Sequence, residues 1–224
     1  MDRVRLILLR HGQTTSNLVH ALDTAVPGAA LTELGEQQAD ALVQALADEP
    51  IEAIYVSVLR RTQQTAAPLA AARGLTPVIR DGLREIPAGE LEMSTERADG
   101  ELYMKVAFAW ADGDLSPSLP GGPSGRDVLA AFDAVVAEAE DALSAPDATA
   151  LLVSHGGILR TWVAARARDV DTGFAAAHPL SNTGIVVLTG STAPDVGWRV
   201  EAWEGEPVLG PDSEDQQDPT GASV

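Results

Sequence analysis

Two segments of the chain follow the same plan: a short apolar run, a histidine, a glycine, and then a stretch that predicts a helix. The first run covers residues 4–9 and leads to His11, and the second covers residues 148–153 and leads to His155. Short apolar runs that stop before a glycine predict buried strands, which carry their last side chains to the carboxyl edge of a sheet. Open α/β sheets bind ligands at that edge. The sequence therefore predicts that two histidines share one ligand-binding edge.

The rest of the chain alternates between strand and helix patterns. Further strands are expected over residues 52–57, 76–80, 182–188 and 198–203, and the opening β-α-β-α-β order implies parallel strands with right-handed crossovers. The predicted fold class is α/β, with a mostly parallel central sheet flanked by helices on both faces in three layers.

Helix ends are marked by residues with known capping roles. Thr32 is suited to begin a helix that runs to about residue 47, with Glu33 and Glu36 in its first turn, where the helix dipole favours carboxylates. Gly74 is suited to end the helix that closes near residue 73. Pro68 lies inside that helix, where it is expected to kink it or to mark the end of its first turn. A further helix is expected over residues 14–22.

An irregular excursion separates these elements from the second histidine. Residues 86–124, with a helix near 100–111, form an insertion too long for an ordinary connection, and we expect it to cap the edge of the first strand. A long amphipathic helix over 124–143 follows. The expected organisation is one domain over residues 1–204, with an acidic, disordered tail over 205–224.

Composition limits the partners. The net charge of −18 argues against nucleic acid and anionic membranes, since both require a basic face. Residues 201–224 hold seven acidic residues and no Lys or Arg. Because exposed charges are screened beyond about 8 Å, arginines close to a cleft can still make the potential there positive. The chain has no cysteine and no segment with the length of a membrane span. A cytoplasmic protein is the default expectation.

The residues beside the first histidine suit phosphate chemistry. Phosphoryl transfer through His11 needs a neutral imidazole aimed at phosphorus, with cations around the phosphate oxygens. Arg10, Arg61 and a protonated His155 are candidates for those cations, because the arginine fork matches phosphate oxygens. Such an arrangement predicts a phosphohistidine intermediate.

Two further groups complete the predicted chemistry. Gly156 and Gly157 leave backbone N–H groups exposed at a helix N-terminus, which suits an anion. Glu85, in the expected cap, is the candidate that protonates the leaving alcohol and then activates water. General acid catalysis of this kind contributes about 10²- to 10⁴-fold in rate.

These residues fall into segments that occur in a fixed order along one known family. Its signatures match the segments Arg10 to Thr14, Leu31 to Ala39, Ser57 to Ala66, Leu83 to Gly89 and Ser154 to Gly156. Together with a late asparagine, Asn182, the matches span roughly residues 4–190. The chain resembles the histidine phosphatase superfamily, in the branch (branch 1) that includes cofactor-dependent phosphoglycerate mutase and small broad-range phosphatases.

The resemblance implies roles for individual residues. It implies that His11 is the nucleophile, that Glu85 is the proton donor, and that the phosphate arginine is Arg61 and not its neighbour Arg60. It also implies a substrate-side position for Asn17. The substrate-binding set expected on this basis is Arg10, Gln13, Asn17, Arg61, Glu85 and Gly156.

The chain also departs from the family pattern. Gln13 replaces the more common glutamate, and Pro123 stands where Gly-Gly-Glu-Ser has its glutamate. The Arg-x-x-Gly-x-x-Asp pattern expected after Asn17 is absent, and the mutase's longer insertion is missing. A mutase must shield its phosphorylated intermediate from water, so a reduced cap favours hydrolysis.

The favoured function is a metal-independent phosphatase for phosphomonoesters of small metabolites, with no cofactor. The alternatives are a phosphoglycerate mutase and a non-catalytic protein that binds phosphorylated ligands. An Asp-x-Asp sequence at Asp112 and Asp114 superficially resembles aspartyl phosphatases, but the single lysine, Lys105, precedes it instead of following it. The histidines lack the spacing of helix-face metal ligands, so no metal site is expected. The natural substrate and the oligomeric state stay open, a homodimer being one option.

Overall fold

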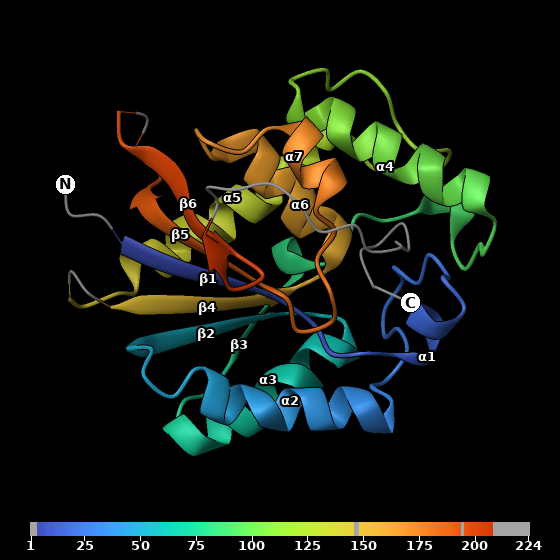
Figure 1. Cartoon of the computed structure of the whole chain (residues 1–224). Coiled ribbons are helices and arrows are strands. Elements are labelled where there is room, and N and C mark those ends of the chain that lie inside the picture. Colours follow the sequence, from blue (N-terminus) through green and yellow to red (C-terminus); the bar gives the residue numbers. More distant parts are fainter. Residues whose placement is uncertain (1–3, 146–147, 194, 208–224) are drawn as a thin grey trace.

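The computed structural model describes residues 4–145, 148–193 and 195–207, which form a sheet with helices on both faces (Figure 1). The strands in these ranges are β1 (Val4–Arg10), β2 (Ile51–Ser57), β3 (Val78–Arg80), β4 (Thr149–Ser154), β5 (Ile185–Ser191), β6 (Gly197–Trp203) and β7 (Glu206–Pro207). They lie in the order β3-β2-β4-β1-β5-β6-β7. The block from β3 to β1 is parallel, whereas β5, β6 and β7 pair antiparallel with their neighbours. The expected α/β fold class is confirmed.

The helices cover the two faces of this sheet. They are α1 (Thr15–Leu18), α2 (Glu33–Ala45), α3 (Arg60–Arg73), α4 (Arg97–Ala111), α5 (Gly125–Asp141), α6 (Gly156–Arg166) and α7 (Thr172–Ala177), with short 3-10 helices η1 (Asp81–Leu83) and η2 (Gly89–Leu91). Helices α2 and α3 lie on one face, and α5, α6 and α7 lie on the other (Figure 1).

The central strand β1 shows why the sheet needs helices on both sides. Residues 6–9 of this strand are apolar without a break, and successive side chains of a strand point to opposite faces. Leu6 and Leu8 belong to the apolar cluster beneath α5 and α6, whereas Ile7 and Leu9 belong to the cluster beneath α2 and α3. All four side chains are fully buried.

Capping residues begin and end the helices as the sequence indicates. The Thr32 hydroxyl accepts a hydrogen bond from the Gly35 N–H at 3.1 Å, and Ser124 caps α5 in the same way at 3.2 Å. Gly74 ends α3 with φ +65°, in the left-handed region that glycine adopts without steric cost. These capping residues mark where the helices begin and end through contacts within the helix ends themselves.

The insertion over residues 86–124 carries η2 and α4 and packs beside α6 (Figure 1). Trp110 of α4 is buried, and its indole N–H donates to the carbonyl of Pro117 at 2.8 Å. The ring lies against the first turn of α5, where a Cβ on Gly125 would come within 2.3 Å of it. The insertion is therefore packed onto the body of the protein.

The local structure departs from the sequence expectations at three places. The first helix ends at Leu18, not near residue 22, because the chain reverses at His20, which has φ 55°. Helix α3 continues through Pro68 to Arg73, so this proline does not end a first turn. Residues 206–207 pair with β6 although they fall in the segment expected to be disordered. Residues 208–224 of that segment lie outside the described residues.

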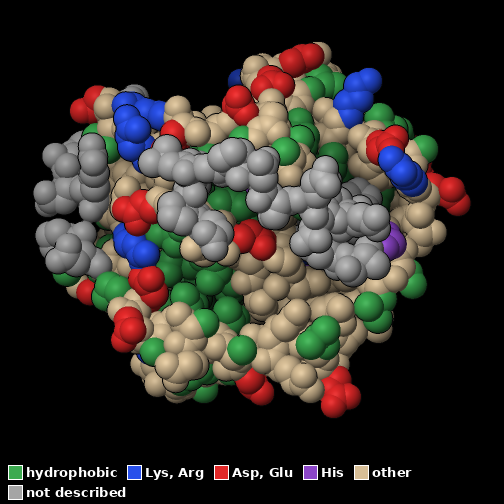
Figure 2. Space-filling model, viewed as in Figure 1, with side chains coloured by type: hydrophobic (Ala, Val, Ile, Leu, Met, Phe, Trp, Pro, Cys, Tyr) green, Lys and Arg blue, Asp and Glu red, His purple; other side chains and the backbone are tan. Residues whose placement is uncertain are grey.

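The face shown in Figure 2 carries acidic side chains both at its edge and nearer its centre, and the visible ones do not form one patch. Basic side chains lie among them on this face. Within the described residues, every helix is too short or too polar to span a bilayer.

Candidate active site

His11 and His155 follow the ends of two neighbouring parallel strands. Arg10 of β1 is level with Ser154 of β4, so the next residue of each strand is a histidine at the same edge of the sheet. The two imidazole centroids lie 5.1 Å apart, with their planes at 60°. Both rings are buried. Strand pairing alone therefore brings these two distant positions together.

Arg61 lies between the two imidazoles. Its Nε–H is shared between Nε2 of His11, at 3.0 Å, and Nδ1 of His155, at 3.2 Å. Its side chain is 4% exposed. It reaches the site from the first turn of α3, whereas the neighbouring Arg60 is exposed. The structure thus places Arg61, not Arg60, in the pocket.

The hydrogen bonds assign one tautomer to each ring. The Nε of an arginine only donates, so His11 Nε2 and His155 Nδ1 both accept and carry no proton. The remaining nitrogen of His11, Nδ1, then donates to the carbonyl of Gly12 at 2.7 Å. The remaining nitrogen of His155, Nε2, donates to Ser57 Oγ at 3.0 Å. The lone pair of His11 Nε2 is therefore engaged by the Nε–H of Arg61 in this structure.

Burial and neighbouring charge keep both histidines neutral. Burial first, and then the charges of Arg61 and Arg10, hold the pKa of His11 well below its usual range. The same burial and the charge of Arg61 lower the pKa of His155. The expectation of a protonated His155 therefore does not describe this structure, in which the arginines supply the positive charge.

Arg10 is the second buried guanidinium near the histidines. It precedes His11 on β1 and is fully buried, and its Nη1 donates to the carbonyl of Leu180 at 2.7 Å. Its charge acts on both imidazoles. The site thus combines two fixed cations with two neutral rings, which suits a dianionic phosphoryl group.

Glu85 lies at the N-terminus of α6. Its carboxylate accepts hydrogen bonds from the N–H groups of Gly157 at 3.0 Å, Ile158 at 2.8 Å and Ile86 at 2.9 Å. A Cβ on Gly157 would lie 2.8 Å from Glu85 Oε1, so the glycine makes room for this carboxylate. The backbone donors expected to bind a ligand anion are therefore partly occupied by Glu85, and the Gly157 N–H is not available for that role.

Tyr103, from α4 of the insertion, lies behind Glu85. It is fully buried, and its hydroxyl donates to the carbonyl of Ile86 at 2.7 Å. Burial and the negative charge of Glu85 raise the pKa of Tyr103 well above its usual range. The phenol therefore stays protonated and links the insertion to the segment that carries Glu85.

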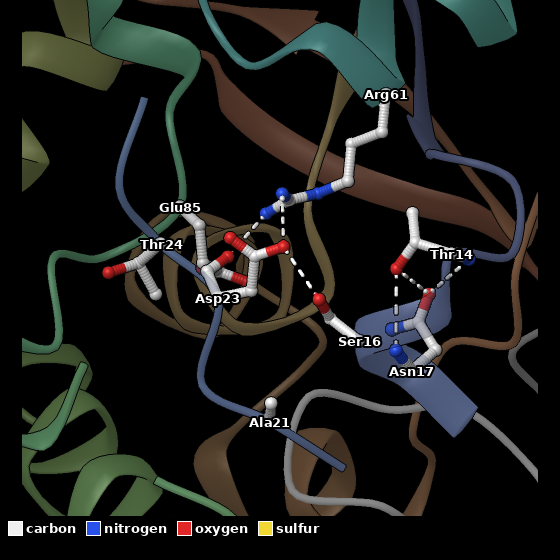
Figure 3. Close-up of a pocket in the computed structure, with 8 residues that line it drawn as sticks. All are labelled: Thr14, Ser16, Asn17, Ala21, Asp23, Thr24, Arg61 and Glu85. Carbon is white, nitrogen blue, oxygen red and sulfur yellow. Dashed lines mark hydrogen bonds and ion pairs between the residues drawn. The ribbon is translucent and has the colours of Figure 1, made fainter. Parts of the chain in front are cut away.

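A small pocket opens beside Arg61 and Glu85 (Figure 3). Its free volume is about 10 Å³, about the room that one water molecule requires. Nη1 of Arg61 is buried there without a hydrogen-bond partner among the described residues. The pocket is lined by Thr14, Ser16, Asn17, Ala21, Asp23, Thr24, Arg61 and Glu85.

Of the other residues predicted to bind substrate, Asn17 lies at the pocket and Gln13 does not. Asn17 lines the pocket, and its Oδ1 accepts from the amide of Asn182 at 3.3 Å. The same amide donates to the carbonyl of His11 at 3.1 Å. Gln13 lies elsewhere, because its side-chain carbonyl accepts a hydrogen bond from the hydroxyl of Thr32 at 2.9 Å.

Two residues of the site were missed by the sequence interpretation. Ser57 holds the imidazole of His155, and Asp23 pairs with Arg61 at 3.5 Å. Ser57 was detectable, since it ends a strand just before the helix that carries Arg61. Asp23 lies in an irregular loop, so no pattern indicates that its side chain turns inward. Among the described residues no group of three or more His, Asp or Glu side chains has the arrangement of a metal site.

The chain is similar in sequence to one known protein family. The sequence pattern described as histidine phosphatase superfamily (branch 1) matches residues 6–204. Glucosyl-3-phosphoglycerate phosphatase of Mycobacterium tuberculosis is 30% identical over 223 residues, covering 93% of this chain and 97% of that protein.

Two further similarities extend this result. A PE-PGRS family protein of Mycobacterium tuberculosis is 39% identical over 214 residues, covering 89% of this chain. The match spans only 36% of that longer relative. The solved structure of mycobacterial glucosyl-3-phosphoglycerate phosphatase with VO3 superposes with a TM-score of 0.74 at 29% identity, covering 91% of this chain and all of the other. These similarities support a phosphatase.

Proposed function

Because the chain belongs to the histidine phosphatase superfamily, branch 1, we propose that it hydrolyses phosphomonoesters of small metabolites through a phosphohistidine at His11. The observation that carries the proposal is the hydrogen-bond pattern of the His11 ring, which indicates its tautomer. Its Nδ1 proton is held by the Gly12 carbonyl, and its unprotonated Nε2 faces Arg61. A neutral imidazole of this tautomer becomes a nucleophile when the Nε–H of Arg61 turns from Nε2 to the phosphoryl group.

The first step forms a bond between His11 Nε2 and phosphorus and breaks the phosphorus–oxygen bond of the ester. Glu85 acts as the general acid and gives a proton to the departing alcohol oxygen. The guanidinium groups of Arg61 and Arg10 bind the equatorial oxygens, where negative charge is spread. Arg61 Nη1, which lacks a hydrogen-bond partner in this structure, supplies one donor without breaking an existing bond.

The second step transfers the phosphoryl group to water. The carboxylate of Glu85 takes a proton from the attacking water, the bond between phosphorus and His11 breaks, and inorganic phosphate leaves. His155 accepts a hydrogen bond from the Nε–H of Arg61 at 3.2 Å through its Nδ1, and so helps to hold that guanidinium beside the phosphoryl oxygens. Removal of one preorganised donor from such a site typically costs about 10²- to 10³-fold in rate.

The substrate is proposed to be a small phosphorylated metabolite. Support comes from the relative named glucosyl-3-phosphoglycerate phosphatase and from the short neutral polar side chains, Thr14, Ser16 and Asn17, that line the pocket. Hydroxyl and amide groups hydrogen-bond to polar alcohols.

The decisive test is His11→Ala. The variant is expected to lose aryl phosphatase activity, and wild-type protein quenched during turnover is expected to carry phosphohistidine. Activity that survives in the pure His11→Ala protein would exclude the mechanism. Products separate the remaining alternatives: interconversion of 2- and 3-phosphoglycerate would indicate a mutase, and phosphate binding without turnover would indicate a binding protein.

A further inference from the structure

The loop over residues 23–29 encloses the guanidinium of Arg61 on two sides. On one side, the main-chain carbonyl of Asp23 accepts a hydrogen bond from Nη2 at 2.7 Å, and the Asp23 carboxylate lies 3.5 Å from Nη1. On the other side the backbone of Gly28 lies so close that a Cβ there would be 2.5 Å from Nη1. The loop therefore restricts where this guanidinium can lie.

The carboxylate of Asp23 is itself fixed. It accepts hydrogen bonds from the Ser16 hydroxyl at 2.8 Å and the Ala29 N–H at 2.9 Å. Its side chain is 9% exposed. Figure 3 shows it between Ser16 and Arg61, on the wall of the pocket. Because other donors hold this carboxylate, it keeps its place when Arg61 changes partners.

The insertion holds the same loop from outside. The carboxylate of Glu92 accepts hydrogen bonds from the N–H groups of Thr24 at 2.9 Å and Ala25 at 3.0 Å, and from the Thr24 hydroxyl at 2.5 Å. These contacts immediately follow Asp23 in the chain. The position of Asp23 is therefore fixed from both the first helix and the insertion.

Building on the proposed function of this pocket, we propose that Asp23 is a positioning residue that orients Arg61 toward the phosphoryl group. An arginine carries five N–H donors, and Asp23 takes one of them through its main-chain carbonyl. Its carboxylate attracts Nη1 at 3.5 Å without a hydrogen bond, so the Nη1 protons stay available for phosphate. The opposite possibility is that the Asp23 carboxylate competes with phosphate for Arg61.

Asp23→Asn separates orientation from competition, because it removes the charge and keeps the shape. If Asp23 orients Arg61, inhibition by orthophosphate weakens about tenfold and kcat/KM for an aryl phosphate falls by a similar factor, since small misplacements in a site reduce rate strongly. Most of the loss is expected in KM. Ser16→Ala, which removes one support of the carboxylate, should give a smaller loss in the same direction. Asp40→Asn, on the exposed face of α2, is the matched control and should behave as wild type.

A double-mutant cycle tests whether the effect passes through Arg61. In an Arg61→Ala background, Asp23→Asn is expected to cause no further loss of orthophosphate binding, because residues that act as one unit are not additive. A thermal unfolding midpoint for each variant identifies any loss that comes from unfolding alone.

Four outcomes overturn the inference. Tighter orthophosphate binding by Asp23→Asn would show competition, and an equal loss in both backgrounds would show that Asp23 acts independently of Arg61. If the wild type is active and Asp23→Asn has the same kcat/KM and the same inhibition by orthophosphate, the positioning role is refuted but the proposed function is not. A wild type that neither hydrolyses aryl phosphates nor binds orthophosphate would refute the proposed function, and this inference with it.

Discussion

The N–H of Gly157 donates to the carboxylate of Glu85 at 3.0 Å, which ties the proposed proton donor to the helix that follows His155. The absence of a side chain at Gly157 makes this contact possible. The acid, the second histidine and the helix N-terminus thus form one rigid unit, although Glu85 belongs to a different part of the chain.

Replacing Glu85 by glutamine tests its part in proton transfer. The amide preserves the size of the side chain but cannot protonate the leaving alcohol, so hydrolysis of alkyl phosphates should fall by about 10²- to 10⁴-fold. An acidic phenol is a good leaving group without protonation. With an aryl phosphate of such a phenol, the rate of phosphohistidine formation should therefore fall much less. Pre-steady-state kinetics on the two substrates makes the comparison. Equal losses for both leaving groups would contradict the role.

Gly157→Ala should disturb the same carboxylate without touching the histidines. The new Cβ would lie 2.8 Å from Glu85 Oε1, so the carboxylate must shift. We expect a lower kcat on alkyl phosphates and unchanged inhibition by orthophosphate, which depends on the arginines. Combination with Glu85→Asp, whose shorter side chain relieves the contact, should recover part of the loss. A uniform drop in both measurements would indicate general misfolding instead.

The neutral histidines predict how stability depends on pH. Burial lowers the pKa values of His11 and His155 in the folded protein, whereas the unfolded chain takes up protons near pH 6.5. Below that pH the unfolded state binds more protons, so stability falls as pH falls, and above it these two groups contribute no slope. Each of the two histidines adds to this loss of stability as the pH falls below 6.5. Urea unfolding at pH 7.5 and 5.5 measures it.

The variant His155→Gln serves as the control for that experiment, because it removes one titrating group and leaves the acidic residues in place. Its stability should change less between the two pH values than that of the wild type. The same lowered pKa predicts that His11 stays a nucleophile in mildly acidic solution, so the acid limb of kcat/KM attributable to it lies below about pH 6.5. An identical pH dependence of stability in wild type and variant would contradict the assignment.

Gly125→Ala tests how the insertion is attached. A Cβ there would come within 2.3 Å of the Trp110 ring, and forcing extra volume into a packed site costs about 1 to 3 kcal/mol. The free energy of unfolding should drop by that amount, while kcat per folded molecule stays near wild type. Ala130→Gly, at an exposed position of the same helix, provides a comparison without a clash. A fully stable Gly125→Ala protein would show that Trp110 moves easily.

The sequence predicts those parts of the site that depend on regular structure. His11 and His155 end strands whose apolar runs are visible, and strand pairing fixes their distance. The family register selects Arg61 over Arg60, and the structure places Arg61 between the two rings.

What escapes prediction depends on irregular backbone. Asp23 turns toward Arg61 because of the path of one loop, and the end of α1 at Leu18 depends on a left-handed residue, His20. The occupation of the α6 N-terminus by Glu85 depends on how the segment after η1 lies against the sheet. None of these leaves a periodic pattern in the residues.

The strand order has a consequence for how the protein is made. β1 is synthesised first, yet both of its partners in the sheet, β4 and β5, come from the last third of the chain. A growing polypeptide therefore leaves the strand that carries Arg10 without its partners in the sheet until β4 and β5 have been synthesised. The apolar first strand stays unpaired in that interval, which makes it an aggregation-prone segment during synthesis.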